Sequence, residues 1–182
     1  MEPNVQKLSL DELNRLSPQE FEQAPRHPLV LVLDNIRSLS NVGAAFRTAD
    51  AFALEKIYLC GITGQPPHRE INKTALGAQE TVAWQHEPSA LEACRQLKQQ
   101  GYTLLAVEQA AGSTMLQHFT PNPNRKYALI FGNEVSGVEE QLIGEAETCL
   151  EIPQWGTKHS LNVAVSMGVV VWSLLENGLA MK

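Results

Sequence analysis

The sequence predicts an α/β domain, a mostly parallel sheet with helices on both faces. Residues 29–34 form a continuous apolar run, LVLVLD, which is typical of a strand buried on both faces. Segments typical of strands and of helices then alternate along the chain with short connections. Of the 182 residues, 43% are hydrophobic and 19% are charged, which suits one domain with one sizeable core.

The first 24 residues predict one or two short helices. Ser9 and Ser17 each stand three residues before a glutamate, as in a capping box, and Pro18 takes the first helical position. Two prolines then separate this segment from the first strand. We therefore divide the chain into an N-terminal helical extension, residues 1–27, and a main domain, residues 28–182.

The rest of the alternation predicts five more strands and five helices. The expected strands are 56–60, 81–84, 102–108, 126–131 and 148–152. The expected helices are 41–52, 72–76, 89–100, 138–145 and 161–176. Residues 112–124, which include two prolines, are expected to form a loop.

The charge distribution leaves room for a nucleic-acid ligand although the total charge is acidic. A formal net charge of −6 argues against phosphate binding. The acids are concentrated in residues 1–24 and 139–151, whereas residues 25–138 hold ten lysines and arginines against nine acids. A local basic face is therefore possible, and an ordinary solvated surface explains the same distribution equally well.

Cysteine usage and the absence of targeting patterns indicate a cytoplasmic protein. Cys60, Cys94 and Cys149 are odd in number and far apart, as expected for reduced, buried thiols. No signal-peptide pattern is found at the N-terminus, and the longest apolar stretch, residues 161–175, is too short and too interrupted for a membrane span. The five histidines are scattered, so we expect no metal site.

The usual nucleotide motifs of α/β domains are missing. A dinucleotide fingerprint needs three glycines directly after the first strand, where this chain has Gly43 alone. No GxxxxGK[ST] or GxSxG pattern occurs. These absences disfavour an NAD-dependent oxidoreductase and exclude a P-loop nucleotidase.

Two segments place glycine and polar side chains directly after predicted strands. In the first, Asn41 can cap a helix, and Gly43 leaves bare the helix face on which Arg47 lies. In the second, FGNEVSG, Gly132 lets a ligand approach the backbone and Glu134 lies at the carboxyl edge of the sheet. Each segment also has an explanation that involves no ligand. The first is explained by a capped surface helix with a solvated arginine, and the second by a Gly-Asn turn.

A third segment, IPQWGTKHSLNVAVS, spans residues 152–166. Its Ile-Pro pair ends a strand, and Ser160 or Asn162 can cap the apolar helix that follows. In this order, the three segments resemble the motifs of the SpoU (TrmH-like) branch of the SPOUT RNA methyltransferases. The resemblance covers about residues 28–176.

The resemblance implies an activity, a cofactor and an assembly. Members of this branch methylate a ribose 2′-hydroxyl with S-adenosylmethionine, which lies in the loops of a C-terminal trefoil knot. They form homodimers through the last helix and the first motif helix, and the shared active site uses both chains. Periodicity alone predicts an open sheet, because chains rarely thread loops.

The resemblance also assigns residues to roles. The implied catalytic residues are Arg47, Asn41, Glu134, Ser160 and Asn162. The implied cofactor-binding residues are Val107, Glu108, Gln109, Gly132, Asn133, Glu134, Ile152, Pro153, Gly156 and Leu161. For RNA binding we expect Arg37, Arg69, Lys73 and Lys158. Arg47 acts either as the general base or as a guanidinium clamp on the adjacent phosphate.

The substrate prediction is RNA, with no DNA, membrane or metal partner. A tRNA comes first because it is compact enough for a small dimer, and rRNA is the alternative. An inactive module that binds RNA or the cofactor is the competing class of function, and a methyl-transfer assay distinguishes it from the enzyme.

Overall fold

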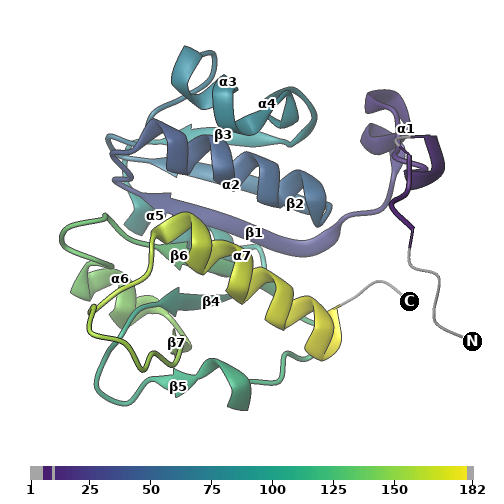
Figure 1. Ribbon diagram of the computed structural model, residues 1–182. Coiled ribbons are helices and arrows are strands. Elements are labelled where there is room, and N and C mark those ends of the chain that lie inside the picture. The colour runs from purple at the N-terminus through teal and green to yellow at the C-terminus, as the bar shows by residue number, and fades with distance from the viewer. Residues whose placement is uncertain (1–5, 10, 180–182) are drawn as a thin grey trace, which may run out of the picture.

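A seven-stranded sheet forms the centre of the computed structural model, which describes residues 6–9 and 11–179 (Figure 1). The strand order is β3-β2-β1-β6-β4-β7-β5, and each of the described pairs is parallel. The strands are β1 His27–Asp34, β2 Leu54–Cys60, β3 Trp84–Glu87, β4 Tyr102–Val107, β5 Thr114–Met115, β6 Lys126–Phe131 and β7 Thr148–Glu151. The predicted parallel α/β class is therefore confirmed.

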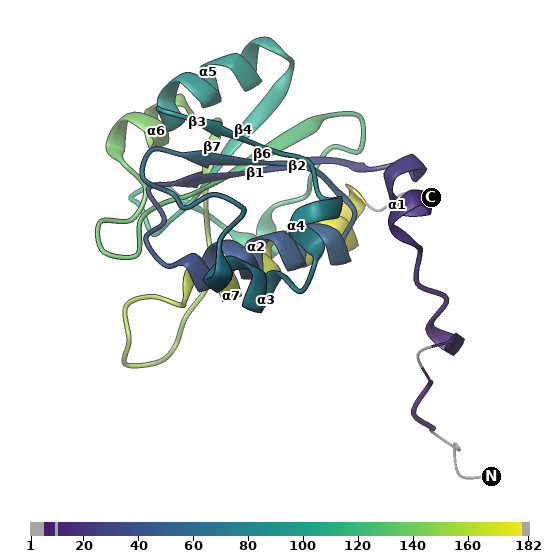
Figure 2. The ribbon, with the colours of Figure 1, turned by 90° about the horizontal axis from the view of Figure 1, so that it is seen from above.

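Helices cover both faces of this sheet (Figure 2). One face carries α5 (Ala90–Gln99) and α6 (Glu140–Glu145). The other carries α2 (Leu39–Ala51), α3 (Arg69–Ala75), α4 (Ala78–Thr81) and α7 (Val163–Leu174). Along β1, Leu31 belongs to the core under α2 and α7, whereas Val32 belongs to the core under α5. This alternation explains why β1 is apolar at successive positions.

The N-terminal segment packs against the main domain. It contains the turn η1 (Asp11–Leu13) and the helix α1 (Pro18–Gln23), whose predicted capping box between Ser17 and Glu20 is present. Phe21 is buried, and the Arg26 guanidinium lies 3.6 Å from the centre of its ring. Just beyond, the His27 Nδ1 atom lies 2.9 Å from the carbonyl oxygen of Leu179.

The expected elements depart most from the structure in two segments, 78–84 and 112–124. The strand expected at 81–84 begins only at Trp84, because Ala78–Thr81 forms α4. This edge strand, WQHE, has no apolar run, and pairing with β2 defines it. The loop expected at 112–124 contains the short strand β5 and the turn η2 (Leu116–His118), because Thr114 and Met115 pair with β7.

The α-helical part of the last helix, α7, ends at Leu174. A π-helical turn, η3 (Leu175–Leu179), follows it and contains Gly178 at a φ of 145°. Within the described ranges, no helix is both long enough and apolar enough to cross a membrane.

Candidate active site

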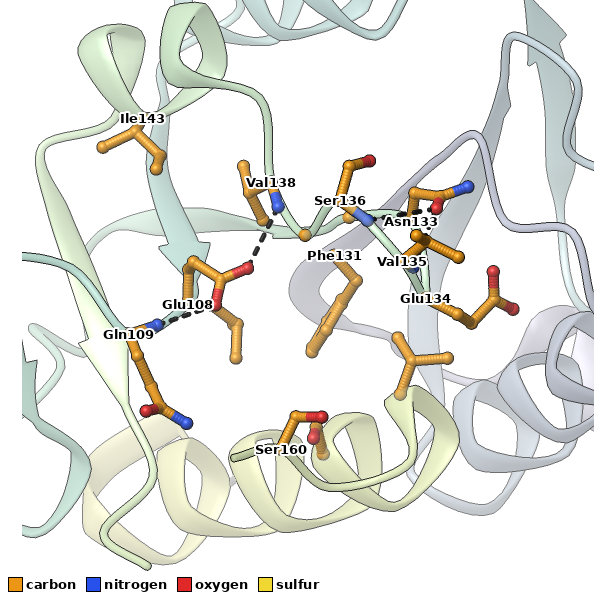
Figure 3. Close-up of a pocket in the computed structure, with 15 residues that line it drawn as sticks. Glu108, Gln109, Phe131, Asn133, Glu134, Val135, Ser136, Val138, Ile143 and Ser160 are labelled. Atoms are coloured by element: carbon orange, nitrogen blue, oxygen red, sulfur yellow. Dashed lines mark hydrogen bonds between the residues drawn. The ribbon is translucent and has the colours of Figure 1, made fainter. Parts of the chain in front are cut away.

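The loops that follow β4, β6 and β7 surround a cavity of about 460 Å³ at the carboxyl edge of the sheet (Figure 3). We call it the edge cavity. Its lining consists of Val107, Glu108, Gln109, Phe131, Gly132, Asn133, Glu134, Val135, Ser136, Gly137, Val138, Ile143, Ser160, Val163 and Ser166. The carboxyl edge is where parallel sheets bind ligands, because helix-connecting loops meet there.

The loop after β6 is closed by its own backbone and by Asn133. The Asn133 Oδ1 atom accepts hydrogen bonds from the N–H groups of Val135 (2.8 Å) and Ser136 (3.3 Å). A Cβ atom on Gly132 would lie 2.1 Å from the carbonyl carbon and oxygen of Gly137. The space on the Cβ side of Gly132 is therefore filled by the loop itself, while Gly132 also lines the edge cavity, and the approach of a ligand to its backbone stays a prediction.

Glu108 fixes the far end of the same loop. Its carboxylate accepts hydrogen bonds from the N–H groups of Val138 (3.0 Å) and Gln109 (2.9 Å). Gly137 has a φ of +69°, and a Cβ atom there would lie 2.2 Å from the Glu108 carboxylate. The Gln109 side chain donates to the carbonyl oxygen of His159. Two adjacent residues after β4 thus hold the loops that follow β6 and β7.

Glu134 points out of the edge cavity toward α2 (Figure 3). Its carboxylate accepts hydrogen bonds from the N–H groups of Arg37 (3.0 Å) and Ser38 (3.1 Å) and from the Asn41 amide (3.0 Å). Partial burial raises the pKa of Glu134, but these donors outweigh burial, so the pKa lies below its ordinary value. The side chain is held as a carboxylate at the start of α2.

Asn41 connects Glu134 to the third segment. The Asn162 amide donates to the Asn41 Oδ1 atom (3.2 Å), and the Asn162 Oδ1 atom accepts from Ala164 N–H (2.9 Å) at the start of α7. Asn162 is therefore the cap of α7. The cap predicted at Asn41 is wrong, because Ser38 caps α2 and Asn41, with 8% of its surface exposed, lies inside the helix. One chain of hydrogen bonds, Glu134–Asn41–Asn162, joins all three segments.

Arg47 lies in a different cavity. This second cavity, of about 450 Å³, is lined by Ala44, Arg47, Thr48, Ala51, Phe52, Lys73 and Thr74, and we call it the Arg47 cavity. A Cβ atom on Gly43 would lie 2.1 Å from the Thr74 hydroxyl and 2.3 Å from the carbonyl oxygen of Ile71. Gly43 therefore permits close packing of α2 on α3, and the bare face expected beside Arg47 is occupied by α3. Among the described residues, none accepts a hydrogen bond from the exposed Arg47 side chain or forms an ion pair with it.

The edge cavity brings together part of the predicted set. Six predicted cofactor-binding residues line it, Val107, Glu108, Gln109, Gly132, Asn133 and Glu134, together with the predicted catalytic Ser160. The cavity lining does not include the other four predicted cofactor-binding residues, Ile152, Pro153, Gly156 and Leu161. Sequence reasoning missed seven lining residues outside glycine, namely Phe131, Val135, Ser136, Val138, Ile143, Val163 and Ser166. Most belong to the recognised segments, whereas Ile143 reaches the cavity only because α6 packs against β4 and α5.

The four predicted RNA-binding cations are exposed on the surface. Arg37 follows β1, Arg69 and Lys73 lie on α3, and Lys158 lies in the loop after β7. Of these, Lys73 forms an ion pair with Glu70 at 2.7 Å. The described residues contain no group of three or more histidine, cysteine, aspartate or glutamate side chains that could hold a metal ion.

A buried carboxyl group ends β1 beside this edge. Asp34 is 3% exposed, and its Oδ1 atom accepts a hydrogen bond from the Asn35 amide at 2.9 Å. Its Oδ2 atom is buried and has no hydrogen-bond partner among the described residues. Burial, with a contribution from Glu139, raises the pKa of Asp34 to about 6.

Comparison with known proteins identifies the family. The model described as "SpoU rRNA Methylase family" matches residues 28–172. The chain belongs to this family. The match extends from the start of β1 into α7, so it includes the Glu134–Asn41–Asn162 chain and both cavities.

Individual SpoU relatives differ in their RNA and in their length. A 23S rRNA (guanosine-2′-O-)-methyltransferase of Neisseria meningitidis is 29% identical over 83% of this chain. The chain spans 59% of that relative's length. A tRNA (guanosine(18)-2′-O)-methyltransferase of Thermus thermophilus is 29% identical over 88% of this chain, which spans 81% of that protein. The S-adenosylmethionine-bound structure of an rRNA methyltransferase from Sinorhizobium meliloti is 26% identical with a TM-score of 0.76, over 89% of this chain and 61% of that one.

Proposed function

We propose that this SpoU-family protein methylates a ribose 2′-hydroxyl of RNA with S-adenosylmethionine. The observation that carries the proposal is the hydrogen-bond chain Glu134–Asn41–Asn162, which fixes the starts of α2 and α7 beside the edge cavity. Both relatives named above are guanosine 2′-O-methyltransferases.

The edge cavity fits the cofactor in size and in chemistry. Its volume of about 460 Å³ lies within the range of about 300–1,000 Å³ for small-molecule sites. Val107, Phe131, Val138 and Ile143 offer apolar surface to an adenine ring, and Ser136 and Gln109 offer polar groups to a ribose or an amino acid. S-adenosylmethionine supplies an electrophilic methyl group on a sulfonium centre, and the protein supplies orientation and proton removal.

Residues of this chain supply the orientation and the proton transfer. Asn41 and Asn162 position the groups at the starts of α2 and α7, and Glu134 holds them in place. Ser160 faces the edge cavity, where it binds the RNA or orients its loop. Arg47 either clamps the phosphate next to the target ribose or removes the hydroxyl proton. We favour the clamp because a guanidinium donates in a fixed fork and is a poor proton acceptor.

A homodimer is part of the proposal, because Arg47 and Ser160 line separate cavities of one chain. The face of α7 that carries Val165, Val169 and Trp172 is apolar and exposed, and Trp172 contacts Phe52 beside the Arg47 cavity. A two-fold interface on this surface buries the apolar face and delivers Arg47 to the partner's edge cavity.

The same proposal includes a knotted fold, a class of RNA substrate and a location in the cell. The chain leaves β4 for β5 at the edge of the sheet, returns to β6 between β1 and β4, and then crosses to β7. This interleaved order supports a trefoil knot formed by the loops around 132–162. Within RNA we place tRNA first and rRNA second, and we place the protein in the cytoplasm, where free cysteines such as buried Cys60 stay reduced.

Mapping of 2′-O-methyl groups tests the proposal. Total RNA from cells lacking the protein is compared with parental RNA, and the purified protein is then supplied with labelled S-adenosylmethionine and the RNA that lacks methylation. We expect one site, or a small set, to lose its methyl group in the cells and to regain it in vitro. Identical methylation maps, with no transfer to bulk RNA, would refute the activity.

A further inference from the structure

The loop between β7 and α7 exposes a large aromatic side chain. Trp155 is 90% exposed, more than any other large hydrophobic residue among those the structure describes. Each residue from 155 to 162 is exposed as well. An indole ring of this size usually contributes to a core or an interface, so its exposure indicates a contact outside the described chain.

The charge of the same loop differs from that of the whole chain. The protein carries a net charge of −6, yet no aspartate or glutamate occurs between Glu151 and Glu176. Lys158 and His159 follow Trp155 within four residues. An aromatic ring near a lysine is typical of surfaces that bind single-stranded RNA, where bases stack and phosphates pair with positive charge.

The loop is fastened at the rim of the edge cavity. The Gln109 side chain donates a hydrogen bond to the carbonyl oxygen of His159, and Ser160, next in the chain, lines the cavity (Figure 3). Trp155 stands five residues before Ser160. Five residues span at most about 17 Å, so one RNA strand is long enough to contact both Trp155 and the edge cavity.

We propose that Trp155 is the stacking platform for an unpaired nucleobase of the substrate RNA, with Lys158 against a phosphate of the same strand. The inference rests on the proposed function. It also identifies which groups of the RNA the loop between β7 and α7 contacts. Stacking tolerates any base, because each base presents a π-face. Trp155 thus contributes affinity for a splayed-out strand and no choice of base.

The first experiment measures binding of an unmodified tRNA transcript that the wild-type protein methylates. In Trp155→Ala, we expect the dissociation constant to rise about 5-fold to 150-fold, the cost of losing one stacked base. Trp155→Phe keeps an aromatic face and should stay within about threefold of wild type. Leu16→Ala, an exposed apolar residue of the N-terminal segment, is the matched control and should bind as wild type does.

The second experiment observes Trp155 directly. The other tryptophans, Trp84 and Trp172, are replaced by phenylalanine, which leaves Trp155 as the only indole. Its fluorescence should be quenched when the tRNA transcript is added, because the ring stacks on a base. Calorimetry with S-adenosylmethionine should give the same affinity for Trp155→Ala as for wild type.

The outcomes separate this inference from the proposed function. If wild type methylates the RNA and Trp155→Ala binds it equally well, the stacking role is overturned and the activity stands. Conversion of Trp155→Ala to monomers in light scattering would assign Trp155 to a second copy of the chain, and a weaker affinity for S-adenosylmethionine would assign it to the cofactor. A wild-type protein that neither binds nor methylates RNA would remove the proposed function itself.

Discussion

The edge cavity and the Arg47 cavity hold their charged groups in different ways. At the edge cavity, the Glu134 carboxylate accepts three hydrogen bonds from the β1–α2 connection and the first turn of α2 in the same chain. At the Arg47 cavity, the exposed guanidinium has no such partner among the described residues. The Glu134 carboxylate is therefore satisfied within its own chain, whereas the Arg47 guanidinium is available to a group outside it. This difference is the physical basis for the proposal that Arg47 belongs to a site shared by two chains.

Removing the guanidinium gives the largest expected effect. Arg47→Ala should lower the rate of methyl transfer about 10²-fold to 10⁴-fold, the range for a lost acid–base group. Binding of S-adenosylmethionine should persist, because Arg47 does not line the edge cavity of its own chain and the proposed clamp contacts the RNA phosphate. Single-turnover transfer and calorimetry measure the two quantities. Wild-type activity in Arg47→Ala would exclude Arg47 from the mechanism.

Arg47→Lys separates the two roles of Arg47. Lysine keeps the charge and loses the planar fork, so a phosphate clamp predicts very low activity at every pH with a modest loss of RNA affinity. A general base predicts a rate that climbs with pH, because an ammonium group gives up its proton more readily than a guanidinium. The pH profile of single-turnover transfer decides between them, and a steep recovery at high pH would contradict the clamp.

Mixed dimers test whether Arg47 acts across the interface. Arg47→Ala and Glu134→Gln are each expected to be inactive by themselves. If Arg47 serves the partner, a heterodimer of the two contains one site with both native residues. Random mixing should then restore about a quarter of the wild-type rate, because half of the dimers are mixed and half of their sites are intact. No recovery after verified subunit exchange would place Arg47 and Glu134 in the same site of one chain.

The substitution Gly132→Ala tests whether the loop after β6 packs closely against Gly132. A Cβ atom there would lie 2.1 Å from the Gly137 backbone, so Gly132→Ala should lower the free energy of unfolding by about 3 kcal/mol, the upper end of the usual overpacking cost. Gly144→Ala is the matched control, since no atom lies within 4 Å of its Cβ position. The control should be neutral or stabilising by up to about 1 kcal/mol, because Gly144 lies in α6. Equal urea midpoints for both variants would contradict the close approach.

Asp34 gives the smallest effect and contrasts with Glu134, since the two pKa values shift in opposite directions. Burial raises the pKa of Asp34 from 3.8 to about 6, so between these pH values the folded protein keeps a proton that the unfolded chain loses. The free energy of unfolding of wild type should therefore fall as the pH rises from 3.8 to about 6. Asp34→Asn lacks this loss, so its free energy of unfolding should rise by about 2 kcal/mol relative to wild type between pH 4 and pH 7.

Urea unfolding at the two pH values measures the Asp34 effect. Glu140→Gln, at an exposed position on α6, controls for the removal of one negative charge from an acidic chain. A difference between Asp34→Asn and wild type that is the same at pH 4 and pH 7 would contradict the raised pKa.

Local sequence patterns determined the elements and the edge on which the site lies. The apolar run at 29–34 falls within β1, and β6 has the predicted bounds, Lys126–Phe131, because strands buried on both faces are apolar at successive residues. Glu134 and Ser160 follow strands in the sequence, so a parallel sheet brings them to one edge. The roles of the individual residues in catalysis and binding stay predictions.

The tertiary structure alone decided the partners of these residues. Asn162 meets Asn41, 121 positions earlier, and Glu134 meets the same residue from 93 positions away. The sequence predicts that Gly43 and Gly132 face a ligand. In the structure, Gly43 lets α3 pack closely on α2, and Gly132 lets the backbone of its own loop pack against it. Close approach between distant segments depends on how layers pack, and no local pattern encodes it. For the same reason, the resemblance names Arg47 and Glu134 together as catalytic residues, and only the packing shows that they line two cavities of one chain.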